Sequence, residues 1–443
     1  MKKSIRENAL VMAFLMVFSL AVSGQEEERV TLELNLQEAV DYALENNFNV
    51  RNARLDIEAA KKEVWKTTAT GLPQANATLD YQYIPGTLPT VEFPSPGGEG
   101  SQEVSLATKS SATYNVRVTQ LVFRGEYFVG LQASRTFLQL SKNSEEKSEI
   151  DTRETVSNNY YTILVLENNK SLLDSSLNNL DKTLKETKAM VEQGFIDDTD
   201  YDQLRITRNT IVNSINSVER QIEVSYLLMK INLGLSKEDE ITLTEDIDNI
   251  LVGVQEEALL NQEFNLEENI EYRILDTQEK IEELNVKREK SMFLPTLSAF
   301  YLYQDRTNKP DFDMTINHII GLNFSLPILS SGQRLASVQQ AKINLEKSQI
   351  QKQQVSKNLV LAVEQARSDF RTAYEKYLTE LESLDLALKV YDETLIKFRN
   401  GVASSLDVTQ ANDQYINTYS NYSQSVLEML TARTALEKAL NNF

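Results

Sequence analysis

The placement of proline constrains this chain more than any other feature, because proline interrupts helices. All eight prolines fall within two short windows, residues 73–96 and 295–327. Between Val355 and Phe398 apolar residues recur in twelve steps over 43 residues, about 3.6 residues per step. That is the period of a straight helix rather than the 3.5 of a left-handed coiled coil. We predict helices over about 333–399 and 125–193, the first about 100 Å long, which must pack side by side.

The two proline windows alternate apolar and polar residues with a period of two, which is typical of β-strands. The alternation is clean over 75–83 and 111–119 and has one exception over 316–326. The segment 297–303 is weaker, because Phe300 and Leu302 break the alternation. Alternation alone does not distinguish a transmembrane strand from a strand of an ordinary half-buried sheet. Evidence for export, together with the long helices, favours transmembrane strands.

The N-terminal residues 1–24 have the pattern of a secretory signal peptide. Lys2, Lys3 and Arg6 precede an apolar run over 9–22, and small and then polar residues follow it. The alternative, a membrane anchor, fits less well because the apolar run is too short to span a bilayer. Removal of residues 1–24 changes the net charge from −20 to −22. We therefore expect an exported, acidic protein.

Four strands per chain are too few to close a barrel across a membrane, which takes about eight. An open sheet in lipid would leave backbone groups at its edges without hydrogen-bond partners. If the alternating segments are transmembrane, several copies of the chain must therefore close one barrel together. This expectation follows from backbone hydrogen bonding alone.

The chain contains an internal repeat. Leu72-Pro73 matches Leu294-Pro295 at an offset of 222 residues, and Gly194 matches Gly401 at an offset of 207. The difference of 15 residues indicates an insertion in the first half, placed most readily in the Pro- and Gly-rich stretch 84–103, which we expect to be a surface loop. We predict a first repeat over 25–234 with strands at about 74–84 and 105–123. An acidic linker over 235–262 and a second repeat over 263–443, with strands at about 296–304 and 314–326, complete the chain.

In this order the segments resemble those of the TolC-like outer-membrane efflux proteins. The resemblance covers the whole mature chain, because its elements occur in sequence and are duplicated at consistent offsets. The segments that carry it are LQEAVDYALENNFNVRNARLDIEAAKKEV (36–64), GLPQANATLDYQY (71–83), FLPTLSAFYLYQ (293–304), GLNFSLPILSSGQRLASVQQA (321–341) and the two segments around Gly194 and Gly401.

The resemblance implies a mainly α-helical protein with a membrane β-barrel part. Three identical protomers would give four strands each to a twelve-stranded outer-membrane barrel, and their helical hairpins would form a periplasmic α-barrel. Such a homotrimer is the exit duct of a tripartite efflux or type I secretion system. Its partners would be a periplasmic adaptor protein, an inner-membrane pump and outer-membrane lipid, and it would need no cofactor. The family does not define the cargo.

The resemblance also assigns roles to residues at the two hairpin tips, which would form the periplasmic entrance. Glycine permits the left-handed backbone that reverses a helix, and Asp197, Asp198, Ser404 and Ser405 can cap the returning helices. Two interhelical turns without a further role would explain the glycines equally well. The expected adaptor contacts are Gly194, Phe195, Ile196, Gly401 and Val402. The expected entrance and gating residues are Thr199, Asp200, Phe398, Ala403, Asp407 and Gln410.

Two of the gating positions depart from the family pattern. Thr199 and Asp200 match positions that hold the second tip shut through a tyrosine and an arginine, but Phe398 and Ala403 stand at those two positions here. Gln410 likewise stands where some members carry a second aspartate. We therefore expect a retained gate with altered latch chemistry, and a single ring of Asp407 carboxylates that favours cations.

Other classes of function find little support in the sequence. The acidic charge argues against a nucleic-acid partner, and the lack of cysteine excludes disulfides and thiolate sites. His318, the single histidine, stands at one of the apolar positions of the alternating segment 316–326, so a metal site, which needs several ligands, is not expected. No enzymatic motif is present in the sequence. Trp65 is expected to pack or to lie at a membrane interface. The alternatives to a duct are a periplasmic adaptor-like protein, which would need additional β modules, and a secreted structural coiled-coil protein.

Overall fold

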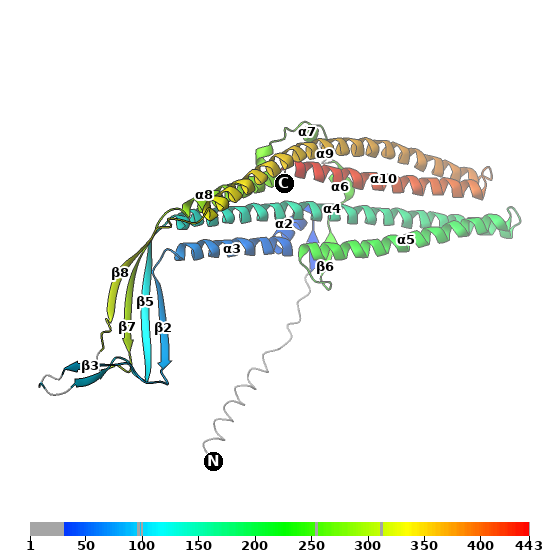
Figure 1. Cartoon of the computed structure of the whole chain (residues 1–443). Helices are drawn as coiled ribbons and strands as arrows, with labels where there is room; N and C mark the ends of the chain where they lie inside the picture. The colour runs from blue at the N-terminus through cyan, green and yellow to red at the C-terminus, as the bar shows by residue number, and fades with distance from the viewer. Residues whose placement is uncertain (1–30, 95–97, 99–100, 253–255, 311–312, 443) are drawn as a thin grey trace, which may run out of the picture. The chain divides into compact units, whose positions relative to one another are not determined.

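The computed structural model describes residues 31–94, 98, 101–252, 256–310 and 313–442 (Figure 1). The predicted signal peptide lies outside these residues. The chain divides into two compact units, each built from three separate segments of sequence. Unit 1 comprises 1–47, 155–254 and 380–427, and unit 2 comprises 48–154, 255–379 and 428–443.

Unit 2 contains a four-stranded antiparallel sheet in the order β2-β5-β7-β8 (Figure 1). Its strands are β2 (Gln74–Tyr83), β5 (Ser110–Arg124), β7 (Thr296–Arg306) and β8 (His318–Ser325). β2, β5 and β8 lie in the alternating segments of the sequence, and β7 covers the weaker segment 297–303. β5 begins later than predicted, because Ser105 pairs in another sheet.

The register of this sheet gathers apolar side chains on one face. Val118 lies opposite both Ala75 and Tyr301, and Tyr301 lies opposite Ile320. Leu79, Ile320 and Leu322 on this face are 70%, 83% and 71% exposed. By the same register the apolar, aromatic and histidine side chains of this face are Ala75, Ala77, Leu79, Tyr81, Tyr83, Ala112, Tyr114, Val116, Val118, Phe123, Leu297, Ala299, Tyr301, Tyr303, His318, Ile320, Leu322 and Phe324. Three polar residues, Ser110, Gln120 and Asp305, lie on the same face.

Phe300, which breaks the alternation in sequence, lies on the opposite, polar face. The guanidinium carbon of Arg117 is 4.9 Å from the centre of its ring. On the other side the ring covers Gly321, where an added Cβ would come within 2.7 Å of ring atoms. The irregular residue of β7 therefore fills the space that a glycine leaves on β8.

The insertion 84–103 is not only a loop, as the sequence suggested. Residues Thr90–Pro94 form β3 and residues Ser101–Ser105 form β4, and the two strands pair as an antiparallel hairpin. Val91 and Glu92 on β3 and Glu103 on β4 are exposed, while Val104 on β4 is half-buried.

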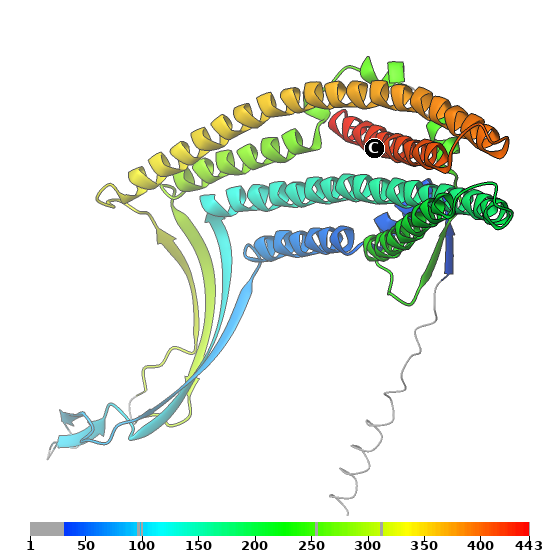
Figure 2. The same ribbon diagram turned by 90° about the vertical axis from the view of Figure 1, so that its right-hand side faces the viewer.

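Four helices of unit 2 are connected to the strands at one end of the sheet (Figure 2). α3 (Phe48–Ala69) leads into β2, and β5 leads into α4 (Gly125–Glu192). α8 (Ile270–Ser291) leads into β7, and β8 is followed by α9 (Gln333–Arg399). α4 and α9 continue into unit 1, as the long helices predicted from the sequence. The short helices α7 (Glu256–Leu260) and η1 (Leu266–Glu268) precede α8.

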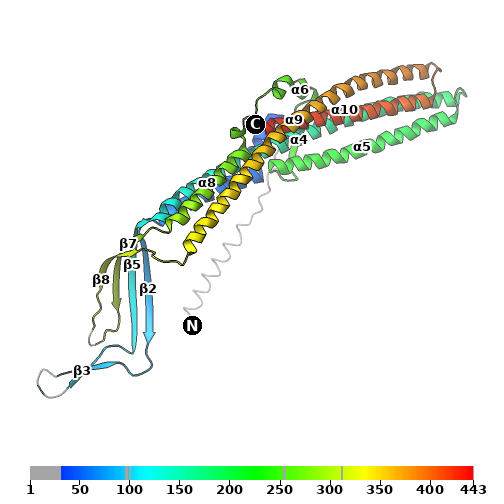
Figure 3. The same ribbon diagram turned by 45° about the horizontal axis from the view of Figure 1, so that its top comes forward.

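Unit 1 contains the tip portions of two antiparallel helical hairpins, α4 with α5 (Asp198–Leu233) and α9 with α10 (Ser405–Ala439) (Figure 3). Residues 155–192 of α4, 380–399 of α9 and 405–427 of α10 belong to this unit. α2 (Leu36–Asn46) also belongs to this unit and begins with a capping box formed by Asn35 and Glu38. The hairpins share an apolar core that includes Leu180, Leu204 and Ile211.

The segment 235–262, predicted as an acidic linker, contains regular structure. β6 (Glu240–Leu243) pairs in parallel with β1 (Thr31–Leu34), and α6 (Ile247–Val252) follows β6. The buried hydroxyl of Tyr160 donates a hydrogen bond to the Leu34 carbonyl (3.2 Å), which ties this small sheet to α4.

Most of the apolar stripe predicted for α9 is buried or half-buried, but the prediction is wrong at Ala362, Leu381 and Leu388, which are exposed. Leu381 and Leu388 are 41% and 38% exposed. The buried and half-buried residues of α9 include a heptad seam, and such a seam keeps facing its neighbouring helices, as in a left-handed coiled coil. The members of the seam are Val363, Phe370, Tyr377, Leu384, Tyr391 and Phe398.

No helix within the described parts of the chain is both long and apolar enough to cross a membrane.

Candidate functional site

The two hairpin tips in unit 1 reverse direction by the same backbone device. Gly194 and Gly401 have φ angles of +76° and +70°, a region that favours glycine. In the first tip the Gly194 amide donates to the Val191 carbonyl and the Phe195 amide to Met190, both at 2.9 Å. The second tip repeats this pattern at the same spacing, with donation from the Gly401 amide to the Phe398 carbonyl and from the Val402 amide to the Lys397 carbonyl. These bonds satisfy carbonyls that the helix ends leave free.

Acidic side chains cap the returning helices. The Asp197 carboxylate accepts a hydrogen bond from the Thr199 amide (3.2 Å) at the start of α5. At the start of α10, the Asp407 carboxylate accepts from the Ser404 amide (2.8 Å) and the Ser404 hydroxyl (2.7 Å). The backbone hydrogen bond from Ser404 is the main cause that lowers the pKa of Asp407 below its ordinary 3.8. Asp407 is exposed and remains charged at neutral pH.

A hydrogen bond joins the first turns of α5 and α10. The buried Ser405 hydroxyl donates to the Asp200 carboxylate. Phe398, with no hydroxyl to offer, is 5% exposed and packs in the apolar core with Leu204 and Val408. Ala403 packs against the same core. Asp200 therefore accepts its hydrogen bond from Ser405, and not from a residue at position 398 or 403, as the family resemblance implied.

Further hydroxyl and amide contacts continue along the same face of α10. The Thr207 hydroxyl donates to the Thr409 hydroxyl (3.4 Å), and the Ser176 hydroxyl donates to the Asn412 side-chain oxygen (3.0 Å). All four groups are buried. Ser405, Thr409 and Asn412 are spaced at i, i+4 and i+7, so one stripe of α10 carries all of these bonds.

The outermost tip residues present apolar side chains to solvent. Phe195 is 75% exposed and Val402, at the equivalent position of the second tip, is 76% exposed, while Ile196 is half-buried. An exposed phenylalanine and valine at matching turns form a surface suited to a protein partner.

The structure brings together some of the sequence-predicted residues and separates others. Asp200, Phe398 and Ala403 meet around one core, whereas Thr199, Asp407 and Gln410 are exposed. Sequence reasoning missed Ser405, Thr409 and Asn412 as contact residues. Their i, i+4, i+7 spacing on the helix that follows Gly401 was the available signal.

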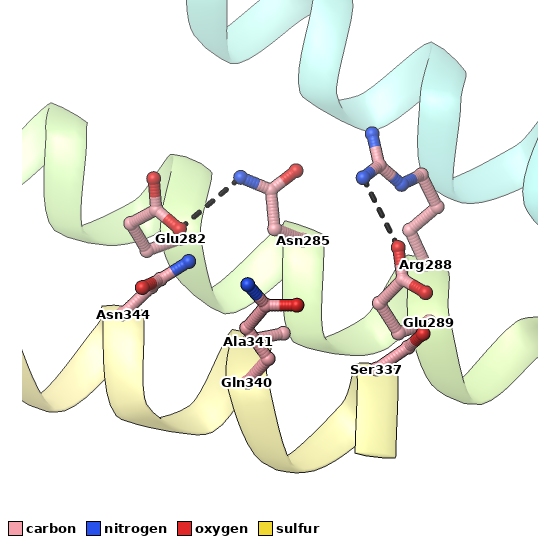
Figure 4. A pocket seen from close by; sticks show the side chains of 8 residues that line it. All are labelled: Glu282, Asn285, Arg288, Glu289, Ser337, Gln340, Ala341 and Asn344. Carbon is pink, nitrogen blue, oxygen red and sulfur yellow. Dashed lines mark hydrogen bonds and ion pairs between the residues drawn. The ribbon is translucent and has the colours of Figure 1, made fainter. Parts of the chain in front are cut away.

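A polar pocket of about 290 Å³ lies between α8 and α9 in unit 2 (Figure 4). Asn285 donates to Glu282 (3.2 Å) and Arg288 pairs with Glu289 (3.1 Å). Ser337 and Ala341 line its α9 side. Across the described ranges, no three His, Cys, Asp or Glu side chains are placed to hold a metal ion. His318 instead lies 2.8 Å from the Tyr301 hydroxyl.

A sheet with an exposed apolar face, joined to long helical hairpins with apolar tips, defines a channel protein of a bacterial outer membrane. A family model, outer membrane efflux protein, matches residues 39–227 and 282–442. The chain belongs to this family, and the resemblance to TolC-like channels is confirmed. Its functions are outer-membrane transport and efflux.

Individual relatives are distant in sequence but similar over nearly their full length. The chain is 19% identical over 438 residues to outer membrane efflux protein BepC of Brucella suis biovar 1 (strain 1330), which covers 97% of this chain and 89% of that protein. A crystal structure of CusC superimposes with a TM-score of 0.74 at 14% identity, covering 94% of this chain and 95% of CusC. The Campylobacter jejuni CmeC outer membrane channel gives a TM-score of 0.70 at 16% identity, with 95% and 90% covered. These structures share the fold.

Proposed function

We propose that the chain forms a homotrimeric outer-membrane duct, passive in itself, that serves as the exit of a tripartite efflux or type I secretion system. The observation that carries the proposal is the sheet β2-β5-β7-β8, whose edge strands each have one neighbour in the sheet and whose apolar face is exposed. Such a sheet is stable in lipid only when its edges are paired.

Pairing between copies of the chain satisfies both edges at once. In a ring, β8 of one copy pairs with β2 of the next, which is a heterologous contact that closes by rotation. All strands of the sheet are antiparallel to their neighbours, so the same alternation continues across the junction. Three copies would give a twelve-stranded barrel, large enough for a water-filled lumen.

The distribution of aromatic residues supports a lipid-facing role for the apolar face. Tyr81, Tyr83, Tyr114 and Tyr303 lie on that face in the part of the strands remote from α3 and α8, whereas Tyr301 lies at the middle of β7. Tyrosine is enriched where a membrane protein meets the membrane–water interface. In the proposed orientation this end faces the outside, and the hairpins extend into the periplasm.

The hairpin tips would form the gated entrance. The exposed Phe195 and Val402 would contact the tip of a periplasmic adaptor protein. The Asp200–Ser405 hydrogen bond and the contacts behind it would hold the second hairpin against the first. Adaptor binding at Phe195, Ile196 and Val402 would favour separation of the hairpins and connect the duct to an inner-membrane pump.

The alternative functions are not supported. A family match that spans both repeats disfavours an adaptor-like or secreted structural protein, and outer membrane efflux channels are not enzymes. The cargo is set by the pump and adaptor that the duct serves.

Recording from planar bilayers tests the proposal. The full mature chain, purified in detergent, should insert as mostly closed pores with brief openings, because the tip contacts hold the entrance shut. Ser405→Ala should lengthen the openings. A protein that inserts into the bilayer and conducts in neither form would overturn the proposed duct.

A further inference from the structure

Within unit 1, α5 and α10 pack on the same helix, α4, which lies between them (Figure 1). The hydroxyl of Tyr226 on α5 donates to the Glu167 carboxylate of α4 at 2.7 Å. The hydroxyl of Tyr419 on α10 donates to the Asn168 side-chain oxygen of α4 at 2.9 Å. Because neighbouring residues point about 100° apart around a helix, α5 and α10 approach α4 from different directions.

An open groove separates α5 from α10 further from the tips. The two helices are in direct contact at Thr207 and Thr409, whose hydroxyls are 3.4 Å apart. Beyond this contact, residues 217–225 of α5 and 420–427 of α10 form the two walls of the groove, and α4 forms its floor. The volume of the groove is about 660 Å³, within the range of about 300–1,000 Å³ that is typical of small-molecule sites.

The lining of the groove combines apolar and neutral polar side chains. On the floor Val165 is buried and Leu166 is half-buried, and on the α5 wall Val224 is 67% exposed. Most of the remaining lining groups are hydroxyls and side-chain amides, which both donate and accept hydrogen bonds. They include Asn169, Ser217, Gln221 and Ser423. An amphipathic molecule with hydrogen-bonding groups matches such a surface.

One cation, Arg220, lies among the described residues that line the groove, and no carboxylate does. The other two arginines of α5 are paired, Arg205 with Asp202 at 3.1 Å and Arg208 with Asp181 at 2.6 Å. Arg220 makes no ion pair within the described parts of the chain. Its guanidinium is therefore available to an anion, and its planar fork of donors matches the two oxygens of a carboxylate.

We propose that this groove binds an amphipathic organic carboxylate. The carboxylate pairs with Arg220, and the apolar part of the molecule lies over Val165, Leu166 and Val224. Carbonyl or hydroxyl groups of the ligand bond to the serine and amide side chains of the walls. The α5 wall belongs to the first hairpin and the α10 wall to the second, so a bound molecule contacts both hairpins. This site goes beyond the proposed duct and does not depend on it.

Photolabelling with 4-benzoylbenzoate tests the site. This water-soluble probe combines a carboxylate, a ketone and two apolar rings, and its ketone attaches to nearby C–H groups under near-ultraviolet light. The full mature protein, purified in a non-ionic detergent, is irradiated with the probe, digested and analysed by mass spectrometry. Label should be found on peptides of α10 as well as on peptides of α4 or α5. Label confined to other elements, or spread evenly over the chain, would overturn the proposal.

The contribution of charge is measured with Arg220→Gln. At a probe concentration below saturation, this variant should carry at least tenfold less label in the groove than the wild type. The matched control is Arg205→Gln, which removes an arginine of the same helix outside the groove and should label as the wild type does. The uncharged 4-benzoylbenzamide should label the wild type and Arg220→Gln equally. Equal labelling of these two proteins by the carboxylate would contradict the role of Arg220.

A second variant tests the location while keeping Arg220. Ser420 is exposed on the α10 wall, so Ser420→Trp should fill part of the groove without disturbing the core, and it should reduce labelling by both probes at least severalfold. Unchanged labelling would place the bound molecule elsewhere. Bilayer conductance of the same samples separates the site from the duct. A conducting protein without label in the groove overturns the site alone, and a labelled protein that inserts without conducting overturns the duct alone.

Discussion

The Ser405 hydroxyl donates a hydrogen bond to the Asp200 carboxylate, joining the first turns of the two helices that return from the hairpin tips. Ser405 is 2% exposed, so water cannot easily replace the bond. Ser405 lies two residues beyond Ala403, and Ala403 and Phe398 pack in the apolar core. A hydrogen bond therefore joins the two hairpins of this chain, and it is made by Ser405 rather than by a residue at position 398 or 403.

Removal of this bond should open the entrance. A hydrogen bond to a charged group contributes about 1.5–3 kcal/mol, so we expect Ser405→Ala to raise the ratio of open to closed channels about tenfold or more. Single-channel recordings give this ratio directly. Ser405→Thr, which keeps the hydroxyl, should stay near wild type, and so should Asp198→Asn in the same turn as Asp200. Equal opening of all three variants would assign the effect to general loosening of the tip.

Charge at the entrance should depend on Asp407. In a trimer its three exposed carboxylates would surround the pore axis and favour cations. Asp407→Asn keeps an oxygen that can accept from the Ser404 amide, so it removes the charge while preserving the cap. Reversal potentials under a salt gradient should show weaker cation selectivity for Asp407→Asn than for Asp197→Asn. Anion preference in the wild type, or equal shifts in both variants, would show that Asp407 does not line the constriction.

The same selectivity should resist moderate acid. In one chain, hydrogen bonds from Ser404 lower the pKa of Asp407 below 3.8, which opposes the rise in pKa that repulsion among the three carboxylates of a trimer would cause. We expect equal reversal potentials at pH 7 and pH 5, and a loss of selectivity only below about pH 4. Loss between pH 7 and pH 5 would assign the selectivity to a group with a higher pKa.

A side chain at Gly321 should disturb the sheet. Its Cβ would come within 2.7 Å of the Phe300 ring, and such overpacking costs about 1–3 kcal/mol. Gly321→Ala should therefore lower the thermal unfolding temperature, and Phe300→Leu/Gly321→Ala should recover much of the loss. Gly86, where no atom lies within 4 Å of an added Cβ, gives the matched control Gly86→Ala. If the Gly321→Ala and Gly86→Ala variants have the same unfolding temperature, the Phe300 ring moves aside at no cost in stability, and the packing argument is contradicted.

The elements with strong periodicity could be predicted from the sequence. Alternation located β2, β5 and β8, and the scarcity of proline located α4 and α9. Gly194 and Gly401 marked the tips, because reversal of a helix needs a left-handed residue. The family resemblance is confirmed by the comparisons, whereas barrel closure and the roles of the tip residues stay predictions.

Other features depend on neighbours that one sequence does not reveal. α9 carries apolar residues on several faces, so the period of its residues could not show that Leu381 and Leu388 lie outside the seam. The partner of Asp200 could not be found by position matching, because Ser405, two residues beyond Ala403, donates the hydrogen bond instead. The parallel pairing of β1 with β6 joins segments about two hundred residues apart and leaves no local pattern.

The hairpin β3–β4 should lie outside the cell. An epitope tag inserted at Gly98, where the backbone has a φ of +88° and open space around it, should bind antibody on intact cells. The same tag at Gly194, in the proposed periplasmic tip, should bind only after permeabilisation. The opposite result for the two tags would reverse the proposed topology.

The number of chains in the detergent-extracted particle tests the account most directly. The edges of the sheet β2-β5-β7-β8 must be paired in lipid, and one chain offers too few strands to do so. Native mass spectrometry of the full mature protein should therefore show three copies, with no stable single chain at low detergent. A stable, membrane-inserted monomer would contradict the account.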